Sequence, residues 1–490
     1  MIIRLAGYNV EAELLEDPGA ASKEVLTPET LSAAYARISR SGKDITTLRR
    51  LARKDVEKTR KSNKTIIFNM GHHSVAEHSV FNFDIIGVSR LALEAVEQFR
   101  LVSYTEKSQR YVTLKGDFVL PKEIEDPESQ ELFRDTVAVQ NAFYEKAYGV
   151  LKEYIFKKYP GMTEQKSQRN ILTGWAKEDA RYILSLATEG QVGMTINARN
   201  LEHLFRRFHL DGRSEVREIG EQMYARVMTI APSLILFARA SSFSGDLKHT
   251  FKDNFKDPGD SERSCPSGIN SPRVVRFTEN GDDIILASFL SVFKSMNYSE
   301  ALEIVGAMSY VEKERIFKDL FKNLEFFDSM PREFEMADIT FQAVISATNF
   351  AQLKRHRMAT LLPGAYDTGC GNLVPENIKI NGLEGEFREI VDRTNGVYFK
   401  LKERYGEAAD YILTNSHCRQ VTMKMNLREL FHFIRLRADE HAQWDIRQLA
   451  EKILEQVRPL MPLSTMLLCG KSDYVERFES IYNRKPKFNI

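Results

Sequence analysis

The stretch Phe350-Ala-Gln-Leu-Lys-Arg-His-Arg-Met-Ala359 decides how the whole chain is interpreted, because two arginines flank a histidine in it. A helix is predicted over residues 343–362, since apolar residues recur there with helical spacing and neither Gly nor Pro occurs before Pro363. Paired guanidinium N–H groups suit planar anions such as phosphate. Taken alone, Arg355-His356-Arg357 fits a solvated basic turn better than a binding site, so the rest of the chain has to decide.

The composition is that of an ordinary globular protein with room for two or more domains: 490 residues, 43% hydrophobic and 28% charged. Lys and Arg (69) balance Asp and Glu (68), so the net charge of +1 gives no electrostatic case for nucleic acid or an anionic membrane. No apolar run approaches the roughly 20 residues of a membrane span, and the first residues do not form a signal peptide. A cytoplasmic protein with neither of these partners is predicted.

The four cysteines lie far apart and form no CxxC pair, which argues against a zinc site or a disulfide framework and fits a reducing cytosol. His72, Glu77 and His78 are either core residues or part of a metal set. Because no compact third ligand is evident, no metal is predicted.

A segment rich in Ser, Gly, Asp, Lys and Pro separates two halves in which the order of strands and helices is similar. Residues 241–271 are predicted to be a linker between an N-terminal module, 1–240, and a C-terminal module, 272–490. Long helices are predicted over 128–159 in the first half and 426–457 in the second.

The two halves read as diverged copies of one module. Arg100 corresponds to Arg357, and Asn197-Ala-Arg199 corresponds to Asn426-Leu-Arg428. The residue 16 positions before the asparagine is Arg181 in one copy and Asp410 in the other.

Together these motifs resemble the flavin-dependent thymidylate synthase (ThyX) family, over about residues 1–235 and 272–470. The first half keeps the family's Gly-His…Glu-His element, the loop after it and the mid-chain residues: Gly71-His72, Glu77-His78, Glu106-Lys-Ser108-Gln-Arg110-Tyr111, Arg181 and Asn197-Ala-Arg199. Its Arg-His-Arg triplet has become Gln98-Phe99-Arg100, and its Leu-Arg-Ala-Asp segment has decayed to residues 207–211.

The second half keeps the complementary set: Gln352, Arg355-His356-Arg357, Asn426-Leu-Arg428, His432 and Arg437-Ala-Asp-Glu-His441-Ala-Gln-Trp444. Its loop reads Pro363-Gly-Ala365-Tyr-Asp367 where the family has Glu, Ser and Arg. Residues 328–335 hold no histidine, and Asp410 replaces the arginine.

In the family, each active site is built between subunits, and the residues retained here divide between the halves in the same way. The resemblance therefore implies a working enzyme with one composite site between the modules. It also implies an α+β fold of two ThyX-like modules, each a small mixed or antiparallel sheet packed with long helices. Because the family forms homotetramers, the fused chain is expected to form a homodimer.

The implied reaction is reductive methylation of dUMP to dTMP, with methylene from methylenetetrahydrofolate, hydride from reduced FAD, and NADPH as reductant of the flavin. Arg437 is the expected catalytic residue, because it would stabilise the base ionised at N3. The expected substrate contacts are Glu106, Ser108, Gln109, Arg110, Arg181, Gln352, Arg355 and Arg437. The expected FAD contacts are His72, Ser74, Glu106, Asn197, Arg199, Arg355, His356, Arg357, Asn426, Arg428, His432 and His441.

Two other functions stay open from the sequence. The chain is alternatively an enzyme that methylates another uridine nucleotide with flavin and folate, or a non-catalytic flavin- or nucleotide-binding protein. The loss of Arg-His in the first half distinguishes the enzyme from the binding protein. If both sites needed that pair, neither would hold FAD, and the chain would not be a flavin enzyme. Nucleic-acid binding is disfavoured by the near-zero net charge.

Overall fold

The computed structural model describes residues 1–16, 25–110, 112, 114, 116–255 and 268–488, and the chain forms two compact units. The first unit comprises Met1–Gly259 and Pro375–Thr414, and the second comprises Asp260–Val374 and Asn415–Ile490. Residues 375–414 thus pack with the first unit although they belong to the second half of the sequence. The module boundaries predicted at residues 240 and 272 concern the sequence repeat and stay a prediction.

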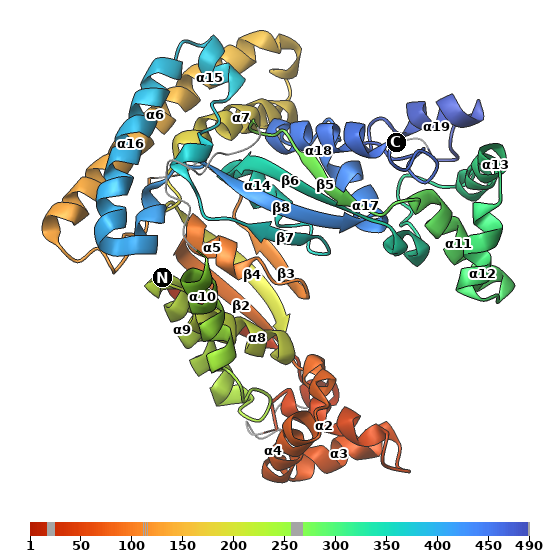
Figure 1. The fold of residues 1–490 in the computed structure, drawn as a ribbon. Coiled ribbons are helices and arrows are strands. Elements are labelled where there is room, and N and C mark those ends of the chain that lie inside the picture. Colours follow the sequence, from red (N-terminus) through yellow and green to blue (C-terminus); the bar gives the residue numbers. More distant parts are fainter. Residues whose placement is uncertain (17–24, 111, 113, 115, 256–267, 489–490) are drawn as a thin grey trace. The chain divides into compact units, whose positions relative to one another are not determined.

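Each unit contains one four-stranded antiparallel sheet packed with helices (Figure 1). The order is β1-β2-β4-β3 in the first sheet and β5-β6-β8-β7 in the second. The strands are β1 (Ile2–Tyr8), β2 (Val80–Ser89), β3 (Val102–Glu106), β4 (Glu189–Asn197), β5 (Arg273–Phe277), β6 (Asp338–Ser346), β7 (Thr360–Pro363) and β8 (Cys418–Asn426). The predicted α+β class is confirmed, and the matching strand order agrees with an internal repeat.

Helices make up much of the remainder of the described chain. Those of the first unit are α1 (Glu13–Glu16), α2 (Glu29–Ile38), α3 (Ile45–Lys54), α4 (Val56–Lys64), α5 (Arg90–Val96), α6 (Pro127–Lys158), α7 (Lys166–Ala180), α8 (Ala198–His209), α9 (Ser214–Ile230), α10 (Ser242–Asn254), α15 (Glu376–Ile380) and α16 (Glu384–Tyr405). Those of the second unit are α11 (Gly281–Lys294), α12 (Tyr298–Gly306), α13 (Tyr310–Phe321), α14 (Ala347–Leu353), α17 (Leu427–Arg437), α18 (Trp444–Val457) and α19 (Tyr474–Tyr482). Short 3-10 or π turns are η1 (Thr65–Asn69), η2 (His73–His78), η3 (Pro160–Met162), η4 (Arg181–Ile183), η5 (Arg332–Met336), η6 (Thr368–Cys370) and η7 (Gly406–Ile412).

The register of the central strand pair is the same in both sheets. Val80 lies opposite Asn197 in the first sheet, and Asp338 lies opposite Asn426 in the second. Each asparagine caps the helix that follows, because its side-chain oxygen accepts the backbone N–H three residues on at 2.9 Å. The repeated Asn-x-Arg motif therefore marks the same junction twice, from β4 into α8 and from β8 into α17.

A serine closes the neighbouring junction in each unit. Ser89 caps α5 and donates its hydroxyl to Glu215 of α9 at 2.6 Å, and Ser346 caps α14 and donates to Asp445 of α18 at 2.5 Å. All four side chains are buried. The serine–carboxylate bond ties α5 to α9 and, in the same way, α14 to α18.

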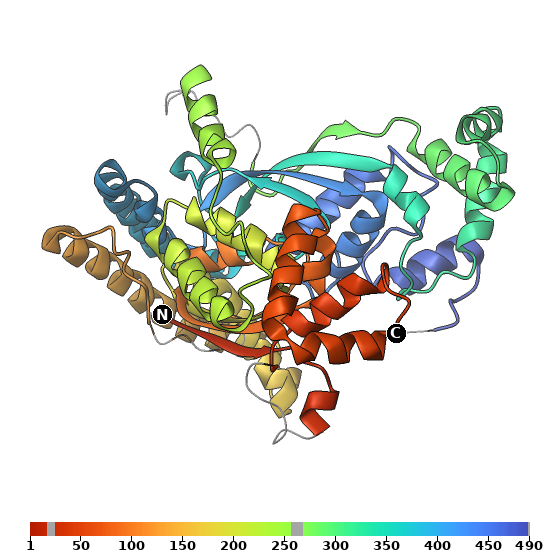
Figure 2. The same ribbon diagram turned by 90° about the horizontal axis from the view of Figure 1, so that it is seen from below.

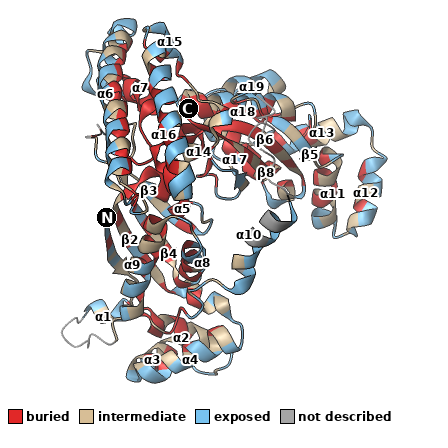
Figure 3. Ribbon diagram, turned by 60° about the vertical axis from the view of Figure 1, so that its left-hand side comes forward, coloured by how far each residue is buried: buried red, intermediate tan, exposed pale blue. Residues whose placement is uncertain are grey.

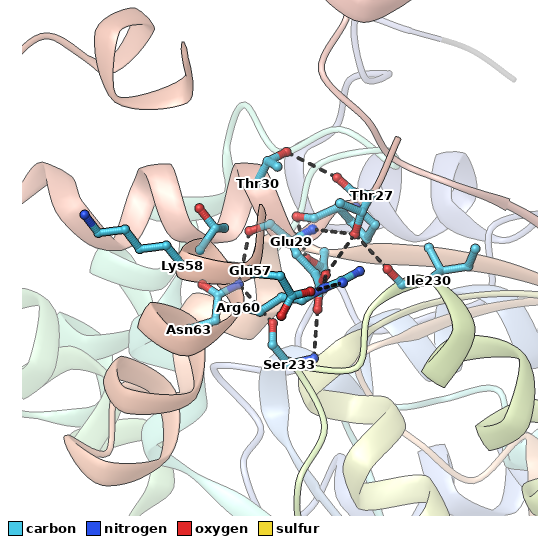
Figure 4. Close-up of polar contacts among 12 residues, drawn as sticks. Thr27, Glu29, Thr30, Glu57, Lys58, Arg60, Asn63, Ile230 and Ser233 are labelled. Atoms are coloured by element: carbon cyan, nitrogen blue, oxygen red, sulfur yellow. Dashed lines mark hydrogen bonds and ion pairs between the residues drawn. The ribbon is translucent and has the colours of Figure 1, made fainter. Parts of the chain in front are cut away.

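A buried glutamate fastens the small helical group α2–α4 to the end of α9 (Figures 2 and 4). Glu29 accepts from Arg60 Nε at 2.7 Å and from the backbone N–H of Ser233 at 2.8 Å. Asp282, at the start of α11, accepts from the backbone N–H and hydroxyl of Ser464 at 2.8 and 2.5 Å. In each half, a carboxylate near the start of a helix, α2 or α11, thus binds the segment that follows α9 or α18.

The prediction of one continuous helix over residues 343–362 is wrong. β6 continues to Ser346, α14 follows it for only seven residues, and β7 begins at Thr360. The last four residues of β6 are all buried (Figure 3), so the alternation of polar and apolar residues that identifies a strand is missing there.

The single helix predicted over 426–457 is also wrong, because α17 and α18 are separate helices. The break is made by Asp439, whose carboxylate accepts the backbone N–H of His441 and of Ser472, each at 2.9 Å. The helix predicted over 128–159 is confirmed as α6, which Asp126 caps and Pro127 begins.

Cys418 and Cys469 are buried free thiols, whereas Cys370 is disulfide-bonded. Cys265 lies outside the described residues. The prediction against disulfides is therefore wrong at Cys370, because spacing in the sequence does not reveal which side chains meet in the fold. No helix in the described ranges is both long enough and apolar enough to cross a membrane.

Replacing Glu29 with Gln is expected to lower the free energy of unfolding of the first unit by about 2 kcal/mol or more. An amide turns one acceptor oxygen into a donor, which would face either Arg60 or the N–H of Ser233. The matched control is Glu57→Gln, because Glu57 also pairs with Arg60 at 2.7 Å but its side chain is 73% exposed; it should change stability little. Urea unfolding followed by circular dichroism measures both, and equal losses would contradict the anchoring role of Glu29.

Candidate functional site

The second unit holds a buried histidine that accepts a hydrogen bond from an arginine. His356 follows α14 and is 2% exposed, and Arg437 is the last residue of α17. Arg437 Nε donates to His356 Nε2 at 2.9 Å. The bond joins the Arg-His-Arg triplet to the late arginine motif.

Burial lowers the pKa of His356 well below its usual value, and the neighbouring Arg437 and His432 lower it further. The imidazole is therefore neutral near pH 7. Since Nε2 accepts from Arg437, the ring proton is assigned to Nδ1, which faces Glu429 Oε1 at 3.5 Å. The neutral imidazole of His356 thus lies between the carboxylate of Glu429 and the guanidinium of Arg437.

Gln352 holds the other side of this arrangement. Its backbone oxygen lies 3.5 Å from Arg437 Nη2, and its side-chain Nε2 donates to Gln443 Oε1 at 3.1 Å. The structure therefore brings together three of the predicted residues, Gln352, His356 and Arg437.

A cavity of about 410 Å³ shares Glu429 with this line of side chains. Its lining includes Asn426, Arg428 and His432, which are three of the predicted FAD contacts. Arg428 pairs with Glu335 at 2.6 Å at the edge of η5. The cavity thus combines a cation and an imidazole of α17 with the amide that caps this helix, and the carboxylates of Asp328, Glu335 and Glu429 line it as well.

Other predicted residues of the second half do not line this cavity. Arg355 and Arg357 are exposed on either side of His356. His441 is exposed in the break after α17, where its Nδ1 lies 3.0 Å from Asp439 Oδ1.

In the first unit, arginines and glutamates alternate around the loop that follows β3. Arg110 Nε lies 2.7 Å from Glu178 Oε1 of α7, and Arg90 Nη1 lies 3.3 Å from Glu106 Oε1. Arg181, at the start of η4, is buried, and burial lowers its pKa. Glu178 raises that pKa, whereas the charges of Arg110 and Arg90 lower it.

The loop itself is held by short-range bonds. The backbone N–H of Arg110 donates to Ser108 Oγ at 3.1 Å, and the N–H of Lys107 donates to the carbonyl of Gln191 in β4 at 2.9 Å. Gln109 is half-buried beside them, and Tyr111 of the predicted motif lies outside the described residues. Glu106, Ser108, Arg110 and Arg181 are thus brought to one region of the first unit.

The remaining predicted residues of the first half lie near η2. His72 and Ser74 are exposed, and His72 Nε2 lies 3.3 Å from Arg40 Nη2. Arg199, two residues after the capping Asn197, forms an ion pair with Glu77. This pair is the counterpart of Arg428–Glu335, because Glu77 and Glu335 each stand three residues before the start of the central strand.

The polar contact between His356 and Arg437 is replaced by an aromatic one in the first unit. Phe99 stands ten residues after Ser89, as His356 does after Ser346, and Phe208 stands eleven after Asn197, as Arg437 does after Asn426. The rings of Phe99 and Phe208 pack edge to face with centroids 6.0 Å apart. Asp410, at the position of Arg181, pairs instead with Lys402 at 3.0 Å.

The sequence did not reveal the roles of Glu429, Gln443 and Glu178, which face His356, Gln352 and Arg110 respectively. Helical spacing gave a signal for Glu429 alone, because it lies on α17 between the predicted Arg428 and His432. Within the described ranges, no three His, Cys, Asp or Glu side chains are grouped so that they could hold a metal ion.

The family model described as "Thymidylate synthase complementing protein" matches the chain in two segments, residues 23–233 and 273–463. Among similar proteins, a UPF0159 protein of Thermoplasma acidophilum is 24% identical over 81% of this chain and 86% of its own length. A UPF0159 protein of Chlamydia muridarum is 24% identical over 83% of this chain and 80% of its own length. A flavin-dependent thymidylate synthase of Clostridium tetani is 31% identical over 37% of this chain and 71% of its own length.

Because the pKa of His356 is lowered in the folded chain, the free energy of unfolding should depend on pH. The unfolded chain binds a proton at this residue below about pH 6.5, whereas the folded chain does not, so folding loses up to about 1.4 kcal/mol per pH unit as the pH falls below that value. In a His356→Gln variant the amide oxygen can still accept from Arg437 but does not titrate. The stability advantage of the wild type over this variant should therefore shrink between pH 7.5 and 5.5, as measured by urea unfolding. A constant difference would contradict a buried neutral imidazole.

Proposed function

Because the chain belongs to the thymidylate synthase complementing protein family, we propose that it is a flavin-dependent thymidylate synthase. It converts dUMP to dTMP with methylenetetrahydrofolate and NADPH, at a single site that draws residues from both halves. The observation that carries this proposal is the complementary survival of polar contacts. The second half retains His356–Arg437 where the first has Phe99–Phe208, and the first half retains Arg181 where the second has Asp410.

The residues of the second unit fit FAD. Arg428 is a cation at the wall of a 410 Å³ cavity whose other donors, His432 and Asn426, suit phosphate and ribose oxygens. The exposed Arg355 and Arg357 would contact the flavin outside this cavity. His356 is buried and bound by Arg437, so it would act through Arg437 and not by direct contact with the flavin. From the first half, His72, Ser74, Asn197 and Arg199 are the further proposed contacts. Bound FAD supplies the hydride of the reaction, and NADPH reduces it.

The nucleotide is proposed to bind through the arginines of the first unit. Arg110 and Arg181 offer guanidinium groups suited to a phosphate, and Arg110 is oriented by Glu178 at 2.7 Å. The N–H bond to Ser108 fixes the loop that carries Arg110, Gln109 and Glu106. Burial of Arg181 strengthens its attraction to an anion, since the local dielectric constant is low.

Arg437 is proposed to act on the base. Its Nε–H is bound to His356, which fixes the plane of the guanidinium, and Gln352 lies against one of its terminal nitrogens. A fixed guanidinium beside the uracil ring stabilises the anion that forms when N3 loses its proton. Gln352 and Arg355 would frame the ring. Because His356 is neutral, it does not neutralise the positive charge of Arg437, and that charge stays available to the base.

The test is the release of tritium from [5-³H]dUMP by the purified chain with FAD, NADPH and methylenetetrahydrofolate. Release that needs all three supports the synthase. No release from yellow protein would indicate another methyl acceptor, and no release from colourless protein would indicate a binding protein; both results contradict the proposal.

Substitutions in the same assay separate the intact residue set from the decayed one. Arg437→Ala and Arg110→Ala are expected to lower turnover by about 100-fold or more, because each removes a charge that faces substrate. Arg100→Ala and Asp410→Ala are the matched controls from the decayed set and should retain most of the activity. Equal sensitivity at Arg100 and Arg437 would contradict a single site with this division of residues.

A further inference from the structure

A groove of about 420 Å³ lies open in the first unit between α8, α9 and the segment that follows α9. Its floor is apolar, with Phe205 and Phe208 from α8 and Tyr224 from α9. Leu236 and Phe237 line the groove and are half exposed. The lining also includes the ionisable side chains His209, Arg217, Glu221 and Arg239. An open groove with an apolar floor and polar groups around it is typical of a surface that binds a protein segment.

The corresponding place in the second unit is covered by the chain itself. Cys469 stands 24 residues after Asp445, as Arg239 does after Glu215, and from there the chain runs along α17. The N–H of Lys471 donates to the carbonyl of Arg435 at 3.1 Å. Gly470 approaches α17 so closely that a Cβ there would clash with the carbonyl oxygen of Ala438.

The helices that follow these two segments differ in the same way. In the second unit, α19 buries Tyr474 and Phe478 in the core. In the first unit, α10 stands away from α8 and α9 (Figure 2). Phe243, Leu247 and Phe251 of α10 and Phe255 directly after it form an apolar stripe with a spacing of four residues, and they are 71, 46, 62 and 66% exposed. The rings of Phe251 and Phe255 stack with centroids 5.6 Å apart.

The connection to α10 is too short for the path that the chain takes in the second unit. Four residues, Gly470 to Asp473, separate Cys469 from the start of α19. Two residues, Ala240 and Ser241, separate Arg239 from the start of α10, and they span about 7 Å at most. Neither of them is a glycine that could take the close approach made at Gly470. A shortened hinge disfavours docking within the chain and favours exchange of the helix between two copies.

We propose that the stripe of α10 docks in the groove of a second copy of this chain, whose own α10 docks in return. The exchange is closed and two-fold, because the same helix and the same groove are used by both copies. Each copy then covers the four exposed side chains of the other. Both surfaces are apolar, because Phe205, Phe208 and Tyr224 form the floor of the groove.

The test is the dissociation constant of the dimer, measured by sedimentation equilibrium over a dilution series of the full chain. The double variant Leu247→Asp/Phe251→Asp should weaken the dimer at least tenfold, because it places two charges in the groove. Both residues are exposed within the copy that carries them, so the fold should be kept, which circular dichroism checks. The matched control is Phe293→Asp/Val311→Asp, two apolar residues of the second unit that are 75 and 71% exposed, more than the 46 and 62% of Leu247 and Phe251, and it should leave the constant unchanged.

A second variant tests the hinge without removing any apolar side chain. Inserting Gly-Lys after Ala240 gives the connection the length that it has in the second unit, so α10 can reach the groove of its own chain and the dimer should again weaken at least tenfold. A wild-type chain that is monomeric at all concentrations would overturn the proposal, as would an unchanged constant in the stripe variant or in the insertion variant.

Discussion

Arg437 reaches His356 from the far end of α17, and its Nε–H finds an acceptor there because the imidazole is buried and neutral. This bond requires that α14 and α17 be held at fixed separation. The Ser346–Asp445 bond ties α14 to α18, and Asn426 caps α17 at the end of β8. Glu429 Oε1 lies 3.5 Å from the other nitrogen of the ring. The bond from Arg437 assigns the ring proton to that nitrogen and fixes the direction of the guanidinium. These contacts of the second unit together fix the position of one cation, the guanidinium of Arg437.

The first unit has the same framework but a different centre. Ser89–Glu215 and the cap at Asn197 repeat the contacts of Ser346–Asp445 and Asn426. Where the oriented cation would lie, Phe99 and Phe208 pack against each other instead. An aromatic pair needs no hydrogen-bond partners and tolerates burial, so this exchange keeps the fold while it removes the charge. Contacts that hold the framework are thus common to both halves, whereas the contact between His356 and Arg437 is present in the second half alone.

Much of this could be predicted from the sequence, and the failures have physical causes. The duplication was visible in the spacing of Asn-x-Arg and Arg100 against Arg357, because a repeated strand-to-helix junction needs the same capping residue. The strand at the end of β6 was missed since both of its faces are buried. The break at Asp439 was missed because the carboxylate finds its partner N–H groups only after folding.

Among site residues, the arginines and histidines of the motifs could be named in advance, whereas the groups that orient them could not. Glu429 lies on α17 between two predicted residues and Gln443 stands in a motif, but which side chains they face, His356 and Gln352, is known only from the fold. Glu178 is far from Arg110 in the sequence and reaches it only through the packing of α7 against the loop after β3. Residues that donate to ligands leave a sequence signal through their type, and residues that position them leave one only through the fold.

The proposed nucleotide site uses residues of both halves, so the stoichiometry of dUMP binding to the flavin-loaded chain is decisive. Isothermal titration calorimetry measures it in the wild type and in the variants Arg181→Ala and Arg437→Ala. We expect one dUMP per chain and loss of binding in both variants, although the two residues belong to different halves. Two dUMP per chain, or full affinity in either variant, would rule out a shared site.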